Sequence, residues 1–445
     1  MLSDMSSGRV NTSYGDRPKS NSSNRPCSAI VLCNSLTGLA TVRSLADAGI
    51  AVYAYLFDDC GALAWSRYGN KVDASHLSDA ELIAIIQEHA KHLSRTANPQ
   101  ADSRPVVLPT SDAHALLLAE HRAQLEPHCR IASTTHAALS AIVRKDLLYQ
   151  TAQRCGVAVV PSIASPLMHE LEAWSLQNSG PYLLKPVYEA MRESSLKVKN
   201  CVLQTRQDLL DFVHLHGSHL LVIQQLLWGG DGEIYDAYGC CDAQGRVLTM
   251  ASHRRIRQYP QHLGTTVYGE IPAQISAVEK LIFEPTERLL ASRCYQGIFG
   301  IEWLHESKTN RWYLIDFNAR PFTTIGHLND CGLNLPALAY ADLCGTDLSH
   351  LPARPKLKHL RWVNFPRDIA RRRNRSTVGA EPLVVWLKSL LQARSFGYWR
   401  WTDPGPSLYK LIEMGKQLLR NAIQRHHPDA KSISHAPANT QAIGS

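Results

Sequence analysis

The chain has 445 residues, of which 44% are hydrophobic and 19% charged, with a formal net charge of +8. This composition is ordinary for a globular protein of two to four domains and excludes a small disulfide-rich scaffold. No apolar run approaches the roughly 18 residues of a membrane-spanning helix, so no membrane span is expected. The eleven cysteines lack a Cys-x-x-Cys pair, which favours reduced thiols.

The ends of the chain are polar. Residues 1–25 are rich in Ser, Asn, Gly and Arg and lack the apolar stretch of a secretion signal, so a disordered leader on a cytoplasmic protein is expected. The tail 426–445 is expected to be disordered too. A basic run comprises Arg367, Arg371, Arg372, Arg373 and Arg375. We interpret this run as a solvated face rather than a nucleic-acid or anionic-membrane site, because no aromatic residues are interleaved with it.

The first structured segment, residues 26–135, alternates strands and helices. Three apolar runs predict buried strands: Ala29–Cys33, Ile50–Leu56 and Pro105–Pro109. Helices are expected over Leu39–Ala48 and Ala113–Gln124, the second capped by Thr110–Asp112. This alternation predicts a parallel sheet and a Rossmann-like domain. The turn SLTGLA lacks G-x-G-x-x-G spacing, which argues against a dinucleotide site.

Two lysines stand out in the middle of the chain. Lys145 opens KDLLYQTAQRCGVAVVPS, whose apolar spacing predicts a helix ending at Gly156 and then a strand over Val157–Val160. Lys185 follows a short apolar strand in PYLLKP. A lysine before a proline on such a strand is unusual for core packing, but its ammonium suits phosphate oxygens. Each lysine alone is weak evidence, and the ordered pair is stronger.

The segment LLVIQQLLWGGDGE reads as an apolar strand, a hinge and the start of another strand. Such a hinge presents backbone groups to the edge of an adenine ring, and we expect this of Gln224, Gln225, Leu226 and Leu227. Glu233 is expected to accept hydrogen bonds from a ribose, with a solvated turn carboxylate as the alternative. In HRRIRQYP, Arg255 and Arg257 would share one face of a strand and suit phosphate or carboxylate oxygens. The alternative for them is a basic surface edge.

Two β-rich runs, GIFGIEWL and RWYLIDFNARP, flank a polar turn and predict a hairpin. Asp316, Asn318 and Arg320 alternate with apolar residues, so they share a face. If Glu302 pairs opposite Leu314, it joins that face and Gly300 lies opposite Asp316. Two carboxylates and an amide oxygen suit Mg²⁺, and Arg320 would neutralise a phosphoryl group in transfer. Polar residues on a solvated sheet face are the alternative.

The chain resembles the ATP-grasp superfamily in the order of its motifs, which are Lys145, Lys185, QQLLWGG, HRRIRQYP, GIEW and LIDFNARP. More narrowly, they resemble the carbamoyl-phosphate-synthase-like carboxylate–amine ligases that include D-aspartate ligase. The resemblance covers about residues 26–345 and the segment 401–409. It implies an α/β (α+β) fold with an ATP-grasp domain of two α+β subdomains over 136–345. Helical periodicity in Leu383–Leu391 and Leu408–Ile423 predicts a C-terminal helical extension over 346–425.

The resemblance also implies the chemistry. ATP would lie between two antiparallel sheets with both lysines on its phosphates, and Glu302, Asp316 and Asn318 would hold Mg²⁺ or Mn²⁺. Arg320, Arg255 and Arg257 are the expected catalytic residues. Two features depart from the family pattern: VYEAMRESS after Lys185 lacks the glycines of a phosphate lid, and Gln225 replaces an acidic residue.

The implied reaction is an ATP-dependent ligation of a small-molecule carboxylate to an amine through an acyl phosphate. No side-chain nucleophile is needed, which agrees with the lack of a Ser-His-Asp or Cys-His signature. The alternatives are a catalytically inactive ATP-binding regulatory module and a kinase that stops at the phosphorylated product. No nucleic-acid partner is expected. The identity of the substrates and the presence of a homodimer stay open.

Overall fold

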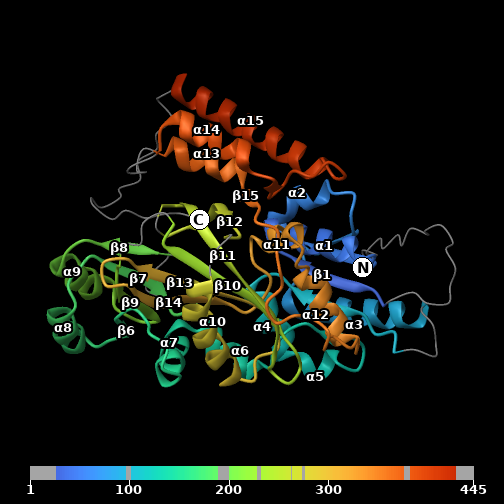
Figure 1. The fold of residues 1–445 in the computed structure, drawn as a ribbon, viewed down its shortest axis with the longest axis horizontal. Coiled ribbons are helices and arrows are strands. Elements are labelled where there is room, and N and C mark those ends of the chain that lie inside the picture. The colour runs from blue at the N-terminus through green and yellow to red at the C-terminus, as the bar shows by residue number, and fades with distance from the viewer. Residues whose placement is uncertain are drawn as a thin grey trace, which may run out of the picture.

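The computed structural model describes residues 27–96, 102–188, 200–227, 232–261, 263–272, 276–374 and 381–426. Several sequence-based expectations lie outside these ranges: the disordered leader, the tail beyond His426, most of the segment after Tyr188, the hinge residues 228–231 and Arg375. Figure 1 shows the chain in order from the N-terminal domain (blue) to a group of helices at the C-terminus (red).

The N-terminal domain is a five-stranded parallel sheet in the order β3-β2-β1-β4-β5. Its strands are β1 (Ala29–Cys33), β2 (Val52–Leu56), β3 (Asn70–Asp73), β4 (Val106–Pro109) and β5 (Arg130–Ile131). Its helices are α1 (Ser35–Asp47), α2 (Gly61–Ala64), α3 (Asp79–Thr96), α4 (Asp112–Glu120) and α5 (Arg122–Leu125), with a 3₁₀ turn, η1 (Asp58–Cys60). Alternate residues of β1 enter two hydrophobic cores, one on each face. Burial on both faces explains the uninterrupted apolar run and confirms the Rossmann-like expectation.

Two details differ from the sequence-based expectation. The helix expected over Ala113–Gln124 is split into α4 and α5 at His121, and Ser111 caps α4 by accepting a hydrogen bond from the amide of His114 at 3.2 Å. The strand expected over Val157–Val160 is reduced to one bridge between Val159 and Leu314.

A four-stranded antiparallel sheet follows in the order β6-β9-β7-β8. Its strands are β6 (Ser162–Ala164), β7 (Tyr182–Pro186), β8 (Cys201–Leu203) and β9 (Leu221–Gln225). The neighbouring helices are α6 (His136–Val143), α7 (Lys145–Arg154), α8 (Met168–Gln177) and α9 (Arg206–His216). Helices α8 and α9 share a hydrophobic core with β7, β8 and β9, which leaves the other face of the sheet for a ligand.

A seven-stranded sheet has the order β14-β13-β10-β11-β12-β15-β16. Its strands are β10 (Ile234–Cys241), β11 (Val247–Tyr259), β12 (Thr265–Glu270), β13 (Gly297–Glu306), β14 (Arg311–Asn318), β15 (Arg361–Val363) and β16 (Ser395–Phe396). Helices α10 (Ser276–Ala291), α11 (Ile325–Cys331) and α12 (Leu335–Leu343) accompany it. The expected hairpin is β13–β14, and the strand expected after the hinge is β10.

The C-terminal part contains α13 (Phe365–Arg373), α14 (Leu383–Gln392) and α15 (Gly405–His426), which lie together at the top of Figure 1. The sequence predicted α14 and α15 but not α13. It also missed β15 and β16, which extend the large sheet, because strands of two or three residues leave almost no periodic signal. Among the helices of the described ranges, none combines the length and apolar content needed to cross a membrane.

The segment between β16 and α15 is fastened to the N-terminal domain through Asp403. Its carboxylate accepts hydrogen bonds from Arg43 at 2.9 Å, from the Ser66 hydroxyl at 2.6 Å and from the Arg67 amide at 2.8 Å. Asp403 is buried, so these donors replace the water it loses on folding. The chain thus returns to its first domain before α15 begins.

Candidate functional site

A cleft lies between the four-stranded and the seven-stranded sheet, with an empty volume of about 980 Å³ out to bulk solvent. Its lining combines two kinds of side chain. The apolar lining residues include Val160, Leu183, Leu226, Leu227, Leu304 and Ile315. The charged lining residues are Lys145, Lys185, Arg255, Glu302 and Asp316. A site that combines an apolar wall with convergent charges suits a ligand that has both a flat apolar ring and anionic groups.

The two lysines reach this cleft from different elements. Lys145 is the first residue of α7, and its ammonium lies 3.3 Å from Asp316 Oδ1. Its backbone amide donates to the carbonyl of Val187, just after β7, at 2.9 Å. Lys185 lies on β7 and also lines the cleft. One loop contact therefore connects the two lysine-bearing segments, although forty positions separate them in the sequence.

The hinge residues line the cleft along the edge of the small sheet. Gln224, Gln225, Leu226 and Leu227 all face it. The amides of Gln225 and Leu226 already donate to the carbonyls of Pro161 and Pro181, at 3.0 and 2.8 Å. Glu233 is placed differently: it precedes β10, its carbonyl accepts from the His305 amide at 2.9 Å, and it does not line the cleft.

Glu302 and Asp316 face each other across the β13–β14 hairpin. The strands pair Glu302 with Asp316 and Gly300 with Asn318, not Glu302 with Leu314 as the sequence suggested. A bulge next to this pair, at Ile315, shifts the register so that Trp303 pairs with Leu314. The carboxylates still share a face, because opposed residues of an antiparallel pair point to the same side.

Gly300 has a different role from the one expected, which was to leave space beside Asp316. A Cβ atom on Gly300 would lie 2.8 Å from the ring of Phe322 and 3.1 Å from that of Tyr238. These two rings stack with centroids 3.6 Å apart. The glycine therefore makes room for an aromatic stack beside the carboxylates.

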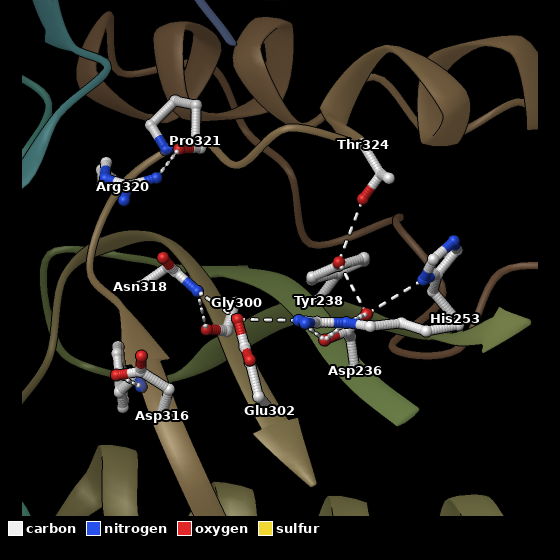
Figure 2. A network of polar contacts seen from close by, with 12 residues as sticks. Asp236, Tyr238, His253, Gly300, Glu302, Asp316, Asn318, Arg320, Pro321 and Thr324 are labelled. Carbon is white, nitrogen blue, oxygen red and sulfur yellow. Dashed lines mark hydrogen bonds and ion pairs between the residues drawn. The ribbon is translucent and has the colours of Figure 1, made fainter. Parts of the chain in front are cut away.

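Two carboxylates and an amide make an oxygen-rich set. The Asn318 amide nitrogen donates to Glu302 Oε1 at 3.1 Å and to the Gly300 carbonyl at 3.4 Å (Figure 2). In the described part of the chain, no three His, Cys, Asp or Glu side chains group as a metal site. Glu302 and Asp316 line the cleft, however, and a hard cation such as Mg²⁺ needs only one or two protein carboxylates when phosphate oxygens and water complete its shell. The residues present therefore fit such an ion.

Arg255 joins the cleft to a buried network, whose members Glu302, Asp236, His253 and Tyr238 are labelled in Figure 2. Its guanidinium lies 2.7 Å from Glu302 Oε1, and its Nε donates to Asp236 at 3.0 Å. Asp236 is fully buried and also accepts from His253 at 2.9 Å and from the Tyr238 hydroxyl at 2.8 Å. Asp236, itself held by His253 and Tyr238, thus fixes Arg255 beside Glu302.

The charges of this network stabilise each other. Burial opposes ionisation of Asp236, but the Arg255 charge and the His253 hydrogen bond outweigh it and lower the pKa of Asp236 to about 2. Burial likewise opposes the charge on Arg255, yet Asp236 and Glu302 raise its pKa well above the usual value. Arg255 therefore stays a fixed cation at the wall of the cleft.

Arg257 does not reach the cleft, although the sequence placed it there with Arg255. Its guanidinium pairs with the buried Asp368 of α13 at 2.7 and 2.9 Å and lies over the ring of Tyr268. The register of β11 against β12 shifts between Arg255 and Arg257, so the alternation of faces is broken there. The bulge sends Arg257 to the C-terminal helices, and Gln258 lines the cleft in its place.

Arg320 lies beyond the end of β14 and forms a two-pronged ion pair with Asp112, both contacts at 3.1 Å. Asp112 is the first residue of α4 in the N-terminal domain. Arg320 does not line the cleft, and in Figure 2 it lies on the far side of Asn318 from Asp316. It links the large sheet to the first domain at the edge of the site.

Sequence reasoning missed three residues that shape the site: Asp236, Tyr149 and Asp112. The Tyr149 hydroxyl donates a hydrogen bond to the Ile315 carbonyl at 3.1 Å and accepts one from the side-chain amide of Gln224 at 3.4 Å. Tyr149 therefore connects α7 to both sheets. An aspartate within the apolar strand IYDAYGCC was the one available signal, because a buried carboxylate needs partners. Asp112 pairs with Arg320, which is 208 positions away in the sequence, so no local sequence pattern could indicate this contact.

No family model and no curated protein matches the sequence. Solved structures resemble the fold at low sequence identity. N5-carboxyaminoimidazole synthetase from Staphylococcus aureus matches with a TM-score of 0.59 and 13% identity, over 79% of this chain and 85% of that one. Biotin carboxylase from Campylobacter jejuni, in a β,γ-ATP complex, matches with a TM-score of 0.56 and 15% identity, over 75% and 74%.

A third neighbour is the biotin carboxylase domain of the 2-oxoglutarate carboxylase from Hydrogenobacter thermophilus, a dimer in complex with MgADP, ADP and bicarbonate. It matches with a TM-score of 0.57 and 12% identity, over 76% of this chain and 73% of that one. Each of these likenesses covers about three quarters of this chain. The chain therefore has the fold of the ATP-grasp proteins, preceded by a Rossmann-like domain.

Proposed function

We propose that this protein is an ATP-dependent carboxylate–amine ligase. In the proposed reaction, a substrate carboxylate attacks the γ-phosphate of ATP, which yields ADP and an acyl phosphate. An amine then displaces phosphate and forms an amide bond. Phosphorylation turns a poor leaving group into a good one, so the protein mainly has to position the reactants and neutralise charge.

One observation carries this proposal. Glu302 and Asp316 face each other in a cleft between the four-stranded and the seven-stranded sheet, within reach of the cations Lys145 and Arg255. A protein that only senses a nucleotide has no need for two opposed carboxylates at the place where phosphates would lie. Alternating fixed cations and carboxylates suit MgATP, because each charge of the ligand then meets its opposite.

The roles follow from position. Glu302 and Asp316, with Asn318 beside them, would hold Mg²⁺ or Mn²⁺, and this ion would neutralise charge on the phosphates. Lys145 and Lys185 would bind phosphate oxygens, and the apolar wall near Leu226 and Leu227 would hold the adenine.

The arginines divide between binding and support. Arg255, immobilised by Asp236, would provide a fixed positive charge near the reacting group. Arg320 remains the proposed partner of the transferred phosphoryl group, which requires it to share or exchange its ion pair with Asp112. Glu233 stays a proposed ribose ligand, although it stands outside the cleft lining. Arg257 is not part of this proposal.

The test is an ADP-release screen with MgATP over pairs of carboxylates and amines, with products identified by mass spectrometry. Bicarbonate belongs in the panel because a structural neighbour is in complex with it. We expect ADP release that depends on the carboxylate and a new amide when the amine is present. Hydroxylamine should replace the amine and give a hydroxamate, since it traps acyl phosphates.

Three other outcomes would contradict the proposal. A stable phosphorylated product that neither amine nor hydroxylamine consumes would identify a kinase. Binding of MgATP without ADP release across the panel would favour a regulatory module. Failure to bind MgATP at all would remove the basis of the proposal.

A further inference from the structure

The C-terminal helices expose apolar stripes that nothing in the described chain covers. On α14, Leu383, Leu387 and Leu391 are spaced four apart, so they lie on one side of the helix, and they are 53%, 47% and 75% exposed. On α15, the exposed apolar residues are Leu408, Leu411, Ile412, Leu418 and Leu419. Their spacing of three, four and seven positions places them on one face as well.

A groove is lined by residues of all three C-terminal helices and includes Leu411 of the α15 stripe. It has an empty volume of about 860 Å³, and its walls are almost entirely apolar, with Phe365 from α13, Leu390 from α14 and Leu411 and Met414 from α15. Trp399 also lines the groove, and Trp401 nearby is 84% exposed. Contiguous exposed apolar surface of this kind marks an interaction site. In Figure 1 the three helices lie at one end of the molecule.

The distal half of α15 strengthens this conclusion. Every side chain from Gly415 to Arg420 is exposed. In water, a helix of a protein draws most of its stability from packing of an apolar face, and this stretch lacks such packing in the described structure. Within the described residues, Leu418 and Leu419 are thus left available to an external surface.

Charge indicates what that surface is. Residues 361–426 contain 13 Lys and Arg against 4 Asp and Glu, a net charge of +9, whereas the whole chain carries +8. The positive charge of the protein is thus concentrated in this extension. Lys388 on α14 and Lys416 and Arg420 on α15 are exposed beside the apolar stripes. Two copies of the extension would repel each other, whereas an anionic surface complements it.

We propose that α13–α15 form a docking surface for an anionic phospholipid bilayer. The leucine stripes and Trp401 would enter the interface between headgroups and acyl chains, and the lysines and arginines would contact the headgroups, as in amphipathic helices that lie in the interface plane. The sequence alone favoured a solvated basic face. That interpretation lacked the exposed leucine stripes and the groove, which only the folded chain reveals.

The test is co-sedimentation of the full-length protein with vesicles at physiological salt. One set is pure phosphatidylcholine, and the other contains about one third phosphatidylglycerol. We expect a partition coefficient at least about tenfold higher on the anionic vesicles. Replacing Leu418→Asp together with Leu419→Asp should lower binding at least about tenfold, because it puts two carboxylates on the inserting face.

The matched control places the same change on α8 and α9, which lie at the left edge of Figure 1, away from α13–α15. Leu176 on α8 and Leu215 on α9 are 75% and 76% exposed, so Leu176→Asp with Leu215→Asp should leave vesicle binding and thermal stability unchanged. A second pair, Lys416→Glu with Arg420→Glu, should reduce binding to anionic vesicles and leave the weak binding to neutral vesicles as it was. Both residues are exposed, so neither change disturbs a core.

Two outcomes would overturn the proposal. Equal or absent binding to both vesicle types would exclude an anionic bilayer as the partner. A dimer in sedimentation equilibrium that the Leu418→Asp, Leu419→Asp variant dissociates, without vesicle binding by the parent chain, would identify a second copy as the occupant of this surface.

Discussion

Arg255 and Arg257 stand two residues apart on β11, and each pairs with a fully buried aspartate. Arg255 meets Asp236 and reaches on to Glu302 in the cleft. Arg257 meets Asp368 and, 3.5 Å away, Glu381 among the C-terminal helices. In chemical terms the two clusters are alike: a buried guanidinium, a buried carboxylate and a second acid.

The clusters differ in where the second acid lies. Glu302 lines the cleft, so its cluster ends at a surface that a ligand can reach. The Arg257 cluster is enclosed by α13, α14 and the sheet. An ion-pair network therefore does not by itself identify an active site. The difference arises from one bulge in β11, which turns two neighbouring arginines toward different sides of the sheet.

The first way to test this comparison is Arg257→Met. Removal of the guanidinium leaves Asp368 buried without its counter-ion, so we expect a loss of about 3–5 kcal/mol in the free energy of unfolding. The KM for ATP should stay within about twofold of the parent value for the protein that folds. Denaturant unfolding and steady-state kinetics measure the two effects. If the loss in kcat/KM, expressed as a free energy, exceeded the loss in the free energy of unfolding, Arg257 would have to take part in catalysis.

On the other side of the comparison, Asp316→Asn should reduce ADP release at least about 100-fold, the scale for a group that stabilises transition-state charge. The side chain is one-third exposed, so the unfolding midpoint should change little. Glu302→Gln should act in the same direction. Near-normal turnover of either variant at saturating Mg²⁺ would show that the carboxylates are not metal ligands.

Lys185→Met keeps the apolar stem and removes the charge. We expect nucleotide binding or turnover to fall at least about tenfold, or about 1.4 kcal/mol, and thermal stabilisation by MgATP to shrink accordingly. Lys145→Met should have the same effect. The control is Lys308, in the turn of the hairpin and exposed, where the same substitution should leave MgATP stabilisation intact. Undiminished stabilisation in both cleft variants would remove the lysines from the site.

A further test concerns the acid stability of the Arg255 cluster. The pKa of Asp236 is lowered to about 2, so its contribution is complete above its unfolded value near 4 and is lost as the pH falls toward 2. The difference in unfolding free energy between the parent and Asp236→Asn should therefore narrow between about pH 4 and pH 2. Denaturant titrations over this range measure it. A constant difference would mean that Asp236 is not ionised in the folded protein.

The sequence predicted the parts of the fold that local pattern determines. Ala29–Cys33 is a strand with the bounds expected, because both of its faces are buried and every residue is apolar or small. The β13–β14 hairpin was predicted because its strands are long and its turn is short. Both lysines, the hinge residues 224–227 and the two carboxylates were placed in one site on motif order, and the structure brings them together around one cleft.

What the sequence missed depends on long-range geometry. The bulges at Ile256 and Ile315 shift register without any glycine or proline to mark them, so Arg257 was assigned to the wrong side and Glu302 to the wrong partner. Asp236 was missed because its role depends on contacts with Arg255 and His253, which lie on the neighbouring strand β11. β16 has two residues and becomes a strand only because β15 is beside it.

The contact between Lys145 and Asp316 has a consequence for how ligands would enter. In the structure the ammonium and the carboxylate are each other's counter-ions. A divalent cation that binds alone would compete with Lys145 for Asp316, and a free nucleotide would compete with Asp316 for Lys145. MgATP satisfies both at once, so the two components should favour each other's binding by the same factor. Under the proposed function, the ion pair between Lys145 and Asp316 should therefore favour MgATP over either component by itself.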